Sequence, residues 1–267
     1  MRALHARSTG ADVRMRCRSG AHTGPTAGLA AGYAQANLVI LPEDLALDFQ
    51  VFCQQNSKPC PLLEKLDAGV FEPRRSAPGA DLRTDLPRYR VFHEGLCVDR
   101  PATIERVWRN DLVAFLIGCS FTFETALREA GLPVRHVEES RNVPMYRTNI
   151  ACEPCGRFAA PLVVSMRPMT PVQADLAKGI TESLHHAHGA PVHIGHPGDI
   201  GIGNLARPDF GDPVTIHPDE VPVFWACGVT PMEAIVCAKP ELAITHEPGH
   251  MFVTDLPDRS IEATDDS

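Results

Sequence analysis

Two short stretches of the chain combine a cysteine, small residues and the start of a predicted helix. Residues 115–128 are FLIGCSFTFETALR and residues 224–237 are FWACGVTPMEAIVC, so each has a Cys-x-x-Thr motif after an apolar run. In each stretch a buried strand is predicted to end near Cys119 or Cys227 and to lead into a helix. The free backbone N–H groups and the dipole at a helix amino terminus favour a bound anion. The two turns together predict a two-pronged anion pocket; the alternative is that each cysteine is a small buried residue between strand and helix.

Arg147 and Asn149 are further candidates for binding a carboxylate. They alternate along a predicted strand, residues 145–150, and therefore share one face of it. A guanidinium group matches the planar fork of a carboxylate, which a lysine cannot do.

Two other clusters of metal-ligand residue types remain ambiguous. In His246-Glu247-Pro248-Gly249-His250, the proline and glycine forbid the undisturbed helix that a zinc protease motif requires. This segment is interpreted either as a turn with one functional histidine or as a metal site that needs a further ligand. Cys152 and Cys155 form a lone Cys-x-x-Cys, interpreted as incidental loop thiols rather than a zinc or redox pair. We assign no metal site and expect no cofactor.

Composition limits the classes of function. The chain has 267 residues, 44% of them hydrophobic, which is enough for a large core. A net charge of -8 argues against nucleic acid or an anionic membrane as the main partner. Nine cysteines without a framework spacing indicate reduced thiols. With no secretory signal and no apolar run of about 20 residues, we expect a cytoplasmic protein. Its partner would be a small carboxylate or amino acid; the oligomeric state is left open, a homo-oligomer being one option.

The pattern of apolar residues, prolines and glycines predicts an α/β fold with a smaller α+β unit inserted into it. Residues 1–144 plus 216–267 would form the main domain and residues 145–215 the inserted one. Helices are predicted at 12–18, 43–55, 103–109, 123–130 and 170–188, the last opened by a capping box at Thr170. Strands are predicted at 37–41, 88–93, 145–150, 161–166, 192–195, 221–225, 242–245 and 251–254, with 221–225 resuming the main sheet.

Several motifs together resemble the hydro-lyase family that is also called YcsI or DUF1445. The resemblance covers nearly the whole chain. It implies a three-layer α/β main domain joined to a smaller two-layer α+β domain. It also implies kinship to the corresponding domain of mitochondrial D-glutamate cyclase, which converts D-glutamate to 5-oxo-D-proline with loss of water. The motifs are GCSFTFE at 118–124, MYRTNI at 145–150, PLVVSMRP at 161–168, ARPDFGD at 206–212, FWACGVTP at 224–231 and PGHMFVTD at 248–255.

The chemistry of such a lyase suggests roles for the candidate residues. Closing glutamate into a lactam needs a neutral amine, a polarised side-chain carboxyl and a proton for the departing oxygen. Because a helix amino terminus lowers the pKa of a thiol, we expect both cysteines to be suited to proton transfer. The hypothesis assigns proton transfer to Cys119, Glu124, Cys227 and His250, and substrate binding to Ser120, Thr122, Arg147, Asn149, Gly228 and Thr230.

Three other functions remain open at this stage. Paired cysteines also serve two-base amino-acid racemases, so epimerisation of a small amino acid is related to the proposed chemistry. A non-catalytic protein that binds a small carboxylate would use the same anion pocket. A metal-dependent hydrolase is the third alternative.

Overall fold

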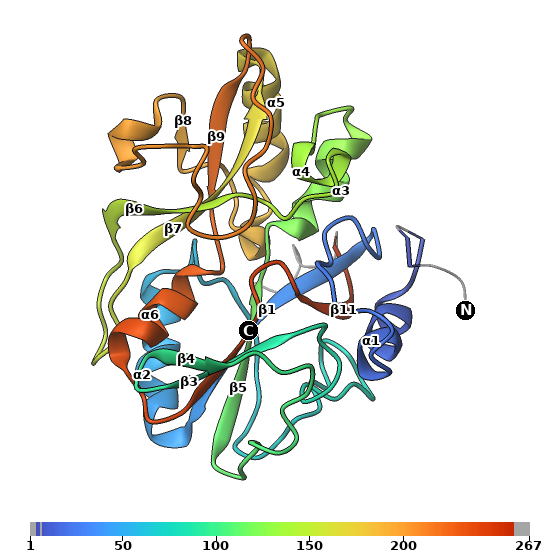
Figure 1. Cartoon of the computed structure of the whole chain (residues 1–267), viewed down its shortest axis with the longest axis vertical. Coiled ribbons are helices and arrows are strands. Elements are labelled where there is room, and N and C mark those ends of the chain that lie inside the picture. The colour runs from blue at the N-terminus through green and yellow to red at the C-terminus, as the bar shows by residue number, and fades with distance from the viewer. Residues whose placement is uncertain (1–3, 6, 259–267) are drawn as a thin grey trace.

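The computed structural model describes residues 4–5 and 7–258, which form two antiparallel sheets, one above the other in Figure 1. Within those residues the large sheet has seven strands in the order β2-β5-β1-β10-β3-β4, and β11 also pairs with β1. Their bounds are β1 Tyr33–Pro42, β2 Leu62–Lys65, β3 Tyr89–His93, β4 Leu96–Asp99, β5 Leu112–Gly118, β10 Ala243–His246 and β11 Phe252–Pro257.

Strands β1 and β5 are neighbouring interior strands of the large sheet, and both are mostly apolar. Every residue of β5 is buried, and β1 is buried from Ala34 onward. Their antiparallel register runs from Ala36 opposite Gly118 to Pro42 opposite Leu112. Strands that are buried on both faces need cover on both sides of the sheet.

Helices cover one face of the large sheet and irregular chain covers the other. On the helical face, α2 (Glu43–Gln55) and α6 (Thr230–Ala238) pack their apolar sides on β1 and β5. On the other face lies the segment between β2 and β3, which forms turns rather than helices and includes Leu82. The hydroxyl of Tyr89 donates a 2.8 Å hydrogen bond to the Leu82 carbonyl and fixes this segment.

Helix α1 (Gly10–Arg18) packs beside β11 at the edge of the molecule (Figure 1). Its Arg14 forms an ion pair with Asp255 at 2.7 Å. Thr9 closes the amino terminus of the helix with a capping box.

The small sheet has the order β6-β7-β9-β8, and all of its pairs are antiparallel. Helices α3, α4 and α5 cover one face of it, around the buried Trp225. The other face packs on a short 3-10 helix, η2, and the loop that follows it. The bounds are β6 Met145–Ala151, β7 Pro161–Met169, β8 His193–Ile194, β9 Val221–Ala226, α3 Phe121–Glu129, α4 Arg135–Glu138, α5 Pro171–Thr181, η1 His185–Ala187 and η2 Pro197–Ile200.

The chain passes between the two sheets at both cysteine turns. Strand β5 belongs to the large sheet, but α3 after it packs Phe123 and Leu127 on the small one. Strand β9 belongs to the small sheet, but α6 after it packs Ile235 on the large one. Cys119 and Cys227 therefore both lie where the two halves of the molecule meet.

The predicted α/β class with two sheets is confirmed, as are the helix at 43–55 and the capping box at Thr170. The prediction that residues 221–225 resume the main sheet is wrong, because β9 pairs with β7 and β8. The predicted helix at 103–109 is wrong, because this segment has a single turn at 105–107 and no helix. Helix α5 ends at Thr181, whose hydroxyl donates to the Ala177 carbonyl, rather than continuing to His188. The division of the chain into 1–144 plus 216–267 and 145–215 stays a prediction, although the small sheet continues through β9.

In the part of the chain that the structure describes, no helix has the length and apolar character that crossing a membrane requires.

Candidate functional site

The two cysteine turns meet across the side chain of Asn37, which belongs to the central strand β1. Its Nδ2 donates to the Gly118 carbonyl at 2.7 Å, at the end of β5. On the other side, a Cβ atom added to Gly228 would lie 1.9 Å from the same Nδ2. Asn37 therefore fills the space between the turns, and only glycine at position 228 allows this approach.

Both thiols are buried and each has a backbone N–H group from its own helix near it. The N–H of Phe121 lies 3.5 Å from the Cys119 sulfur, and that of Val229 bonds the Cys227 sulfur. The predicted lowering of the thiol pKa values is wrong. Burial raises the pKa of Cys227 to about 11 and that of Cys119 still further, because these N–H groups offset only part of the lost hydration. Both thiols are therefore protonated at neutral pH.

Arg167 of β7 supplies a positive charge beside the thiols. Its side chain is fully buried, and its guanidinium group donates to the hydroxyls of Ser120 and Ser165 at 3.1 Å each and to the Glu124 carboxylate. This charge acts to lower the pKa of both cysteines, although burial outweighs it. An anion formed on either sulfur would thus have a cation nearby.

Glu124 is held in its ionised form by two neighbours. Burial alone would raise the pKa of its carboxyl, but His136, whose Nε2 lies 3.1 Å from Oε1, and Arg167 together hold that pKa at about 2. The contacts make Glu124 the counter-ion of Arg167. Its predicted part in proton transfer stays a prediction.

The threonines of the two Cys-x-x-Thr motifs have the same local role. The hydroxyl of Thr122 accepts the backbone N–H of Gln35 at 3.2 Å, and that of Thr230 accepts the N–H of Val163 at 3.0 Å. Each hydroxyl thus satisfies a backbone group of a neighbouring strand, which gives the repeated motif a structural reason. Carboxylate binding by Thr122 and Thr230 stays a prediction and would compete with these hydrogen bonds.

Arg147 already has ion-pair partners. It forms a two-pronged pair with Glu233 in the first turn of α6, at 2.7 and 2.9 Å, and a further pair with Asp209 at 2.8 Å. Asn149 is exposed and, together with Cys152, lines a surface cavity of about 480 Å³. Within residues 4–5 and 7–258 no hydrogen bond or ion pair joins Arg147 or Asn149 to Cys119 or Cys227, so their predicted binding role stays a prediction.

The two histidines after β10 differ in their surroundings. Burial lowers the pKa of His250, whose Nδ1 lies 3.1 Å from the Pro248 carbonyl, so its Nε2 can accept a proton. Burial lowers the pKa of His246 to about 4, and its Nδ1 accepts the N–H of Leu38 at 3.2 Å. Glu247 between them is paired with Arg90. Among the described residues no group of three or more His, Cys, Asp or Glu has an arrangement that could hold a metal ion.

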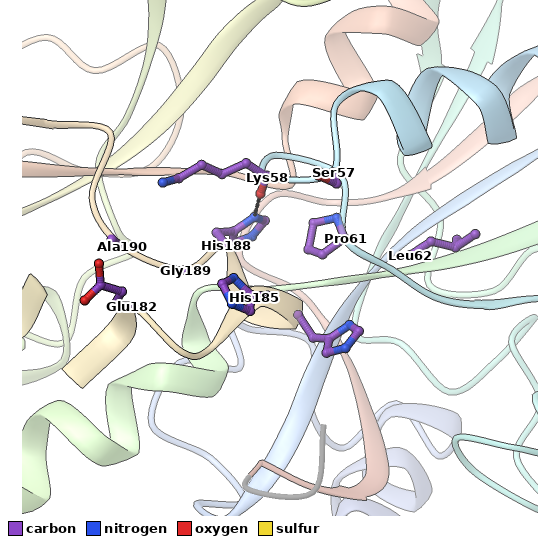
Figure 2. Close-up of a pocket in the computed structure, with 10 residues that line it drawn as sticks. Ser57, Lys58, Pro61, Leu62, Glu182, His185, His188, Gly189 and Ala190 are labelled. Carbon is purple, nitrogen blue, oxygen red and sulfur yellow. Dashed lines mark hydrogen bonds between the residues drawn. The ribbon is translucent and has the colours of Figure 1, made fainter. Parts of the chain in front are cut away.

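A cleft of about 530 Å³ opens between two loops (Figure 2). One wall is the loop after α2, which includes Ser57, Lys58 and Pro61, and the other is residues 182–190 after α5. The walls are joined by His188, whose Nδ1 donates to the Lys58 carbonyl at 2.8 Å.

The cleft and the first turn share a boundary at Gly118. A Cβ atom added to Gly118 would lie 1.7 Å from the His186 carbonyl oxygen and 3.3 Å from Pro61. The backbone before Cys119 therefore packs directly against both walls of the cleft. Glycine is required at position 118 because of this close approach.

Sequence reasoning missed the polar residues that connect the two turns. Arg167 is a lone charge in the apolar run of β7, and Asn37 is one of two amides in the buried part of β1, so each carried a detectable signal. Ser165 and His136 carried none, because their importance depends on contacts with residues far away in the chain.

Comparisons with known proteins agree with one another. A family described as D-glutamate cyclase matches residues 113–255. A protein named "Putative hydro-lyase" from Rubrobacter xylanophilus is 60% identical over 94% of this chain and 97% of its own length. One of the same name from Stutzerimonas stutzeri is 57% identical over 94% of this chain and 95% of its own length. A protein named "Putative hydro-lyase YcsI" from Bacillus subtilis is 53% identical over 94% of this chain and 97% of its own length.

Proposed function

Because the chain belongs to the D-glutamate cyclase family, as its motifs had indicated, and its relatives are named as hydro-lyases, we propose that it is a lyase that closes D-glutamate into 5-oxo-D-proline and water. The observation that carries this proposal is the meeting of two protonated thiols beside a buried guanidinium group.

The reaction removes two protons from the substrate nitrogen and adds two protons to the departing oxygen. The amine nitrogen attacks the carbon of the side-chain carboxyl, a C–N bond forms, and one carboxyl oxygen leaves as water. In total the ammonium nitrogen loses two protons, and the departing oxygen gains two. A site with two groups that can each give and take one proton matches this count.

In the proposed mechanism Cys119 and Cys227 carry these protons. One thiol gives its proton to a side-chain carboxylate oxygen, and its thiolate takes a proton from the ammonium group, so that the neutral amine can attack. The second thiol then gives its proton to the departing hydroxyl, which leaves as water, and its thiolate takes the second proton from the nitrogen. Both sulfurs end the cycle as they began. The raised pKa values support this order, since the thiols must be protonated when the substrate binds. The transient thiolates would be stabilised by Arg167 and by the N–H groups of the two helix amino termini.

The same reasoning favours dehydration over racemisation. A two-thiol racemase needs one sulfur ionised before it removes the α-proton, whereas burial keeps both Cys119 and Cys227 protonated. Non-catalytic binding of an amino acid would leave the thiols without a use.

Proton NMR of D-glutamate, L-glutamate and 5-oxoproline in deuterated buffer tests the proposal. We expect lactam resonances to appear from D-glutamate. Loss of the α-proton signal without lactam would establish racemisation instead, and three unchanged compounds would refute both reactions.

Variants then connect the activity to the thiols. Cys119→Ser and Cys227→Ser should each lower turnover by about 100-fold or more, the usual effect of losing a positioned acid or base. Cys237→Ser, at an exposed position, is the matched control and should keep full turnover. Full activity in both buried-thiol variants would remove the cysteines from the mechanism.

A further inference from the structure

The cleft beside Gly118 has a charge of each sign on its walls. Lys58 is on the loop after α2 and Glu182 is at the carboxyl end of α5; both side chains are exposed and both line the cleft (Figure 2). Neither has an ion-pair partner within residues 4–5 and 7–258. Other charged residues considered above, such as Arg147 and Glu124, are already paired.

The walls that carry these charges are fixed in place. His188 donates to the carbonyl of Lys58 itself, so the backbone that bears the ammonium group is tied to the opposite wall. Burial lowers the pKa of His188 to about 4, so its ring adds no charge at neutral pH. The wall with Glu182 is anchored by Thr181, whose hydroxyl accepts the indole N–H of Trp225 at 3.2 Å. Such a cleft is largely formed before a ligand arrives.

This pair of charges selects a class of ligand. A simple dicarboxylate would be attracted by Lys58 and repelled by Glu182, and a simple amine would meet the reverse. A zwitterion that carries a carboxylate and an ammonium group satisfies both. The volume of about 530 Å³ lies in the usual range for small-molecule sites and exceeds what a five-carbon amino acid needs.

We propose that this cleft binds an α-amino acid, with its α-carboxylate on Lys58 and its ammonium group on Glu182. The side chain of the amino acid then extends along the cleft toward Pro61 and His186, the residues that pack on Gly118 beside Cys119. The assignment deepens the proposed function and rests on it for the use made of the bound molecule, but binding itself is tested without turnover.

The test compares two probes that differ only in the amine. D-glutamate and glutarate have the same carbon chain and the same two carboxylates. Dissociation constants are measured by ligand-observed NMR for the wild type, Lys58→Met and Glu182→Gln; where D-glutamate is converted, its initial-rate KM replaces the dissociation constant. Lys58→Met should weaken both probes by about threefold to fivefold, as expected for an exposed charge contact. Glu182→Gln should weaken D-glutamate by a similar factor and leave glutarate unchanged or bound more tightly.

Lys239→Met and Asp219→Asn provide controls with the same charge changes at exposed positions that do not line the cleft. They should leave both probes unaffected. The proposal is overturned if the wild type binds neither probe, if the cleft variants behave like the controls, or if Glu182→Gln weakens glutarate as much as D-glutamate. Because all four positions are exposed, these variants should fold normally.

The results also separate this proposal from the proposed reaction. Charge-dependent binding of D-glutamate without lactam would support the cleft and refute the cyclase activity. Lactam formation with an unchanged KM in both cleft variants would support the activity and place the substrate elsewhere.

Discussion

Replacing Arg167 with methionine should destabilise the protein strongly, because it leaves the buried Glu124 carboxylate without the guanidinium group that donates two hydrogen bonds to it. Arg167 is 0% exposed, and Glu124, its counter-ion, is 4% exposed. Breaking a buried ion pair from one side typically costs about 3–5 kcal/mol. For a chain of this size, that loss corresponds to a Tm about 6–20 °C lower.

A double-mutant cycle shows whether the cost comes from the orphaned carboxylate. In Glu124→Gln with Arg167→Met no buried charge of this pair remains, so the double variant should be more stable than Arg167→Met by about 1–3 kcal/mol. Urea unfolding at pH 7, monitored by fluorescence and circular dichroism, measures both quantities. A loss below about 1 kcal/mol in Arg167→Met, or a double variant less stable than that single one, would refute the reasoning.

The same pair predicts a pH dependence. The pKa of Glu124 in the fold is about 2, below its ordinary value of 4.5, so its ionised form stabilises the protein above pH 4.5. That stabilisation is lost as the pH falls from 4.5 toward 2. The wild type should therefore lose stability over this window more steeply than Glu124→Gln does, and parallel curves would contradict the low pKa.

Three further predictions concern the turns. Alkylation of Cys227 by iodoacetamide should be slow at pH 8 and accelerate as the pH approaches about 11. The exposed Cys237 should react readily at pH 8. Peptide mass spectrometry measures both rates, and equal rates would contradict the raised pKa of Cys227. Gly118→Ala should lower the free energy of unfolding by more than about 2 kcal/mol, because the new Cβ would lie 1.7 Å from a carbonyl oxygen. Gly179→Ala, which has open space around it on helix α5, should raise that free energy by up to about 1 kcal/mol. Chemical unfolding compares the two variants, and equal effects would argue against the close approach at Gly118. Thr230→Val should cost about 1–3 kcal/mol in the same assay because it leaves a buried strand N–H unpaired, and a neutral effect would contradict that structural role.

Local patterns in the sequence predicted individual helices and strands better than they predicted which strands pair with one another. The helix at 43–55 and the capping box at Thr170 depend on residues within one turn of each other, and both are present. The error for residues 221–225 is of another kind. A short apolar run fits either sheet, and it is the pairing with β7 that places it in the small one.

The candidate site shows the same limit. The repeat of Cys-x-x-Thr was visible in the sequence, but its threonines turned out to serve neighbouring strands. The effect of a helix amino terminus on a thiol is also a local argument. It failed here because burial depends on the whole fold, and burial has the larger effect on the pKa of Cys119 and Cys227.

The position of the site between the two sheets also bears on why the charged side chains of Arg167 and Glu124 are buried there. Because the chain crosses between the sheets at both cysteine turns, the thiols are brought together only when the two halves of the molecule assemble. A buried ion pair is a weak source of net stability, since an apolar replacement often serves as well. The ion pair of Arg167 and Glu124 is therefore better explained by the positively charged guanidinium group that it holds beside the sulfurs. A variant with both residues neutral should keep the fold but leave a thiolate without its nearby cation, so stability and turnover should separate in that variant. A double variant that folds and still forms lactam at the wild-type rate would show that the cation has no part in the reaction.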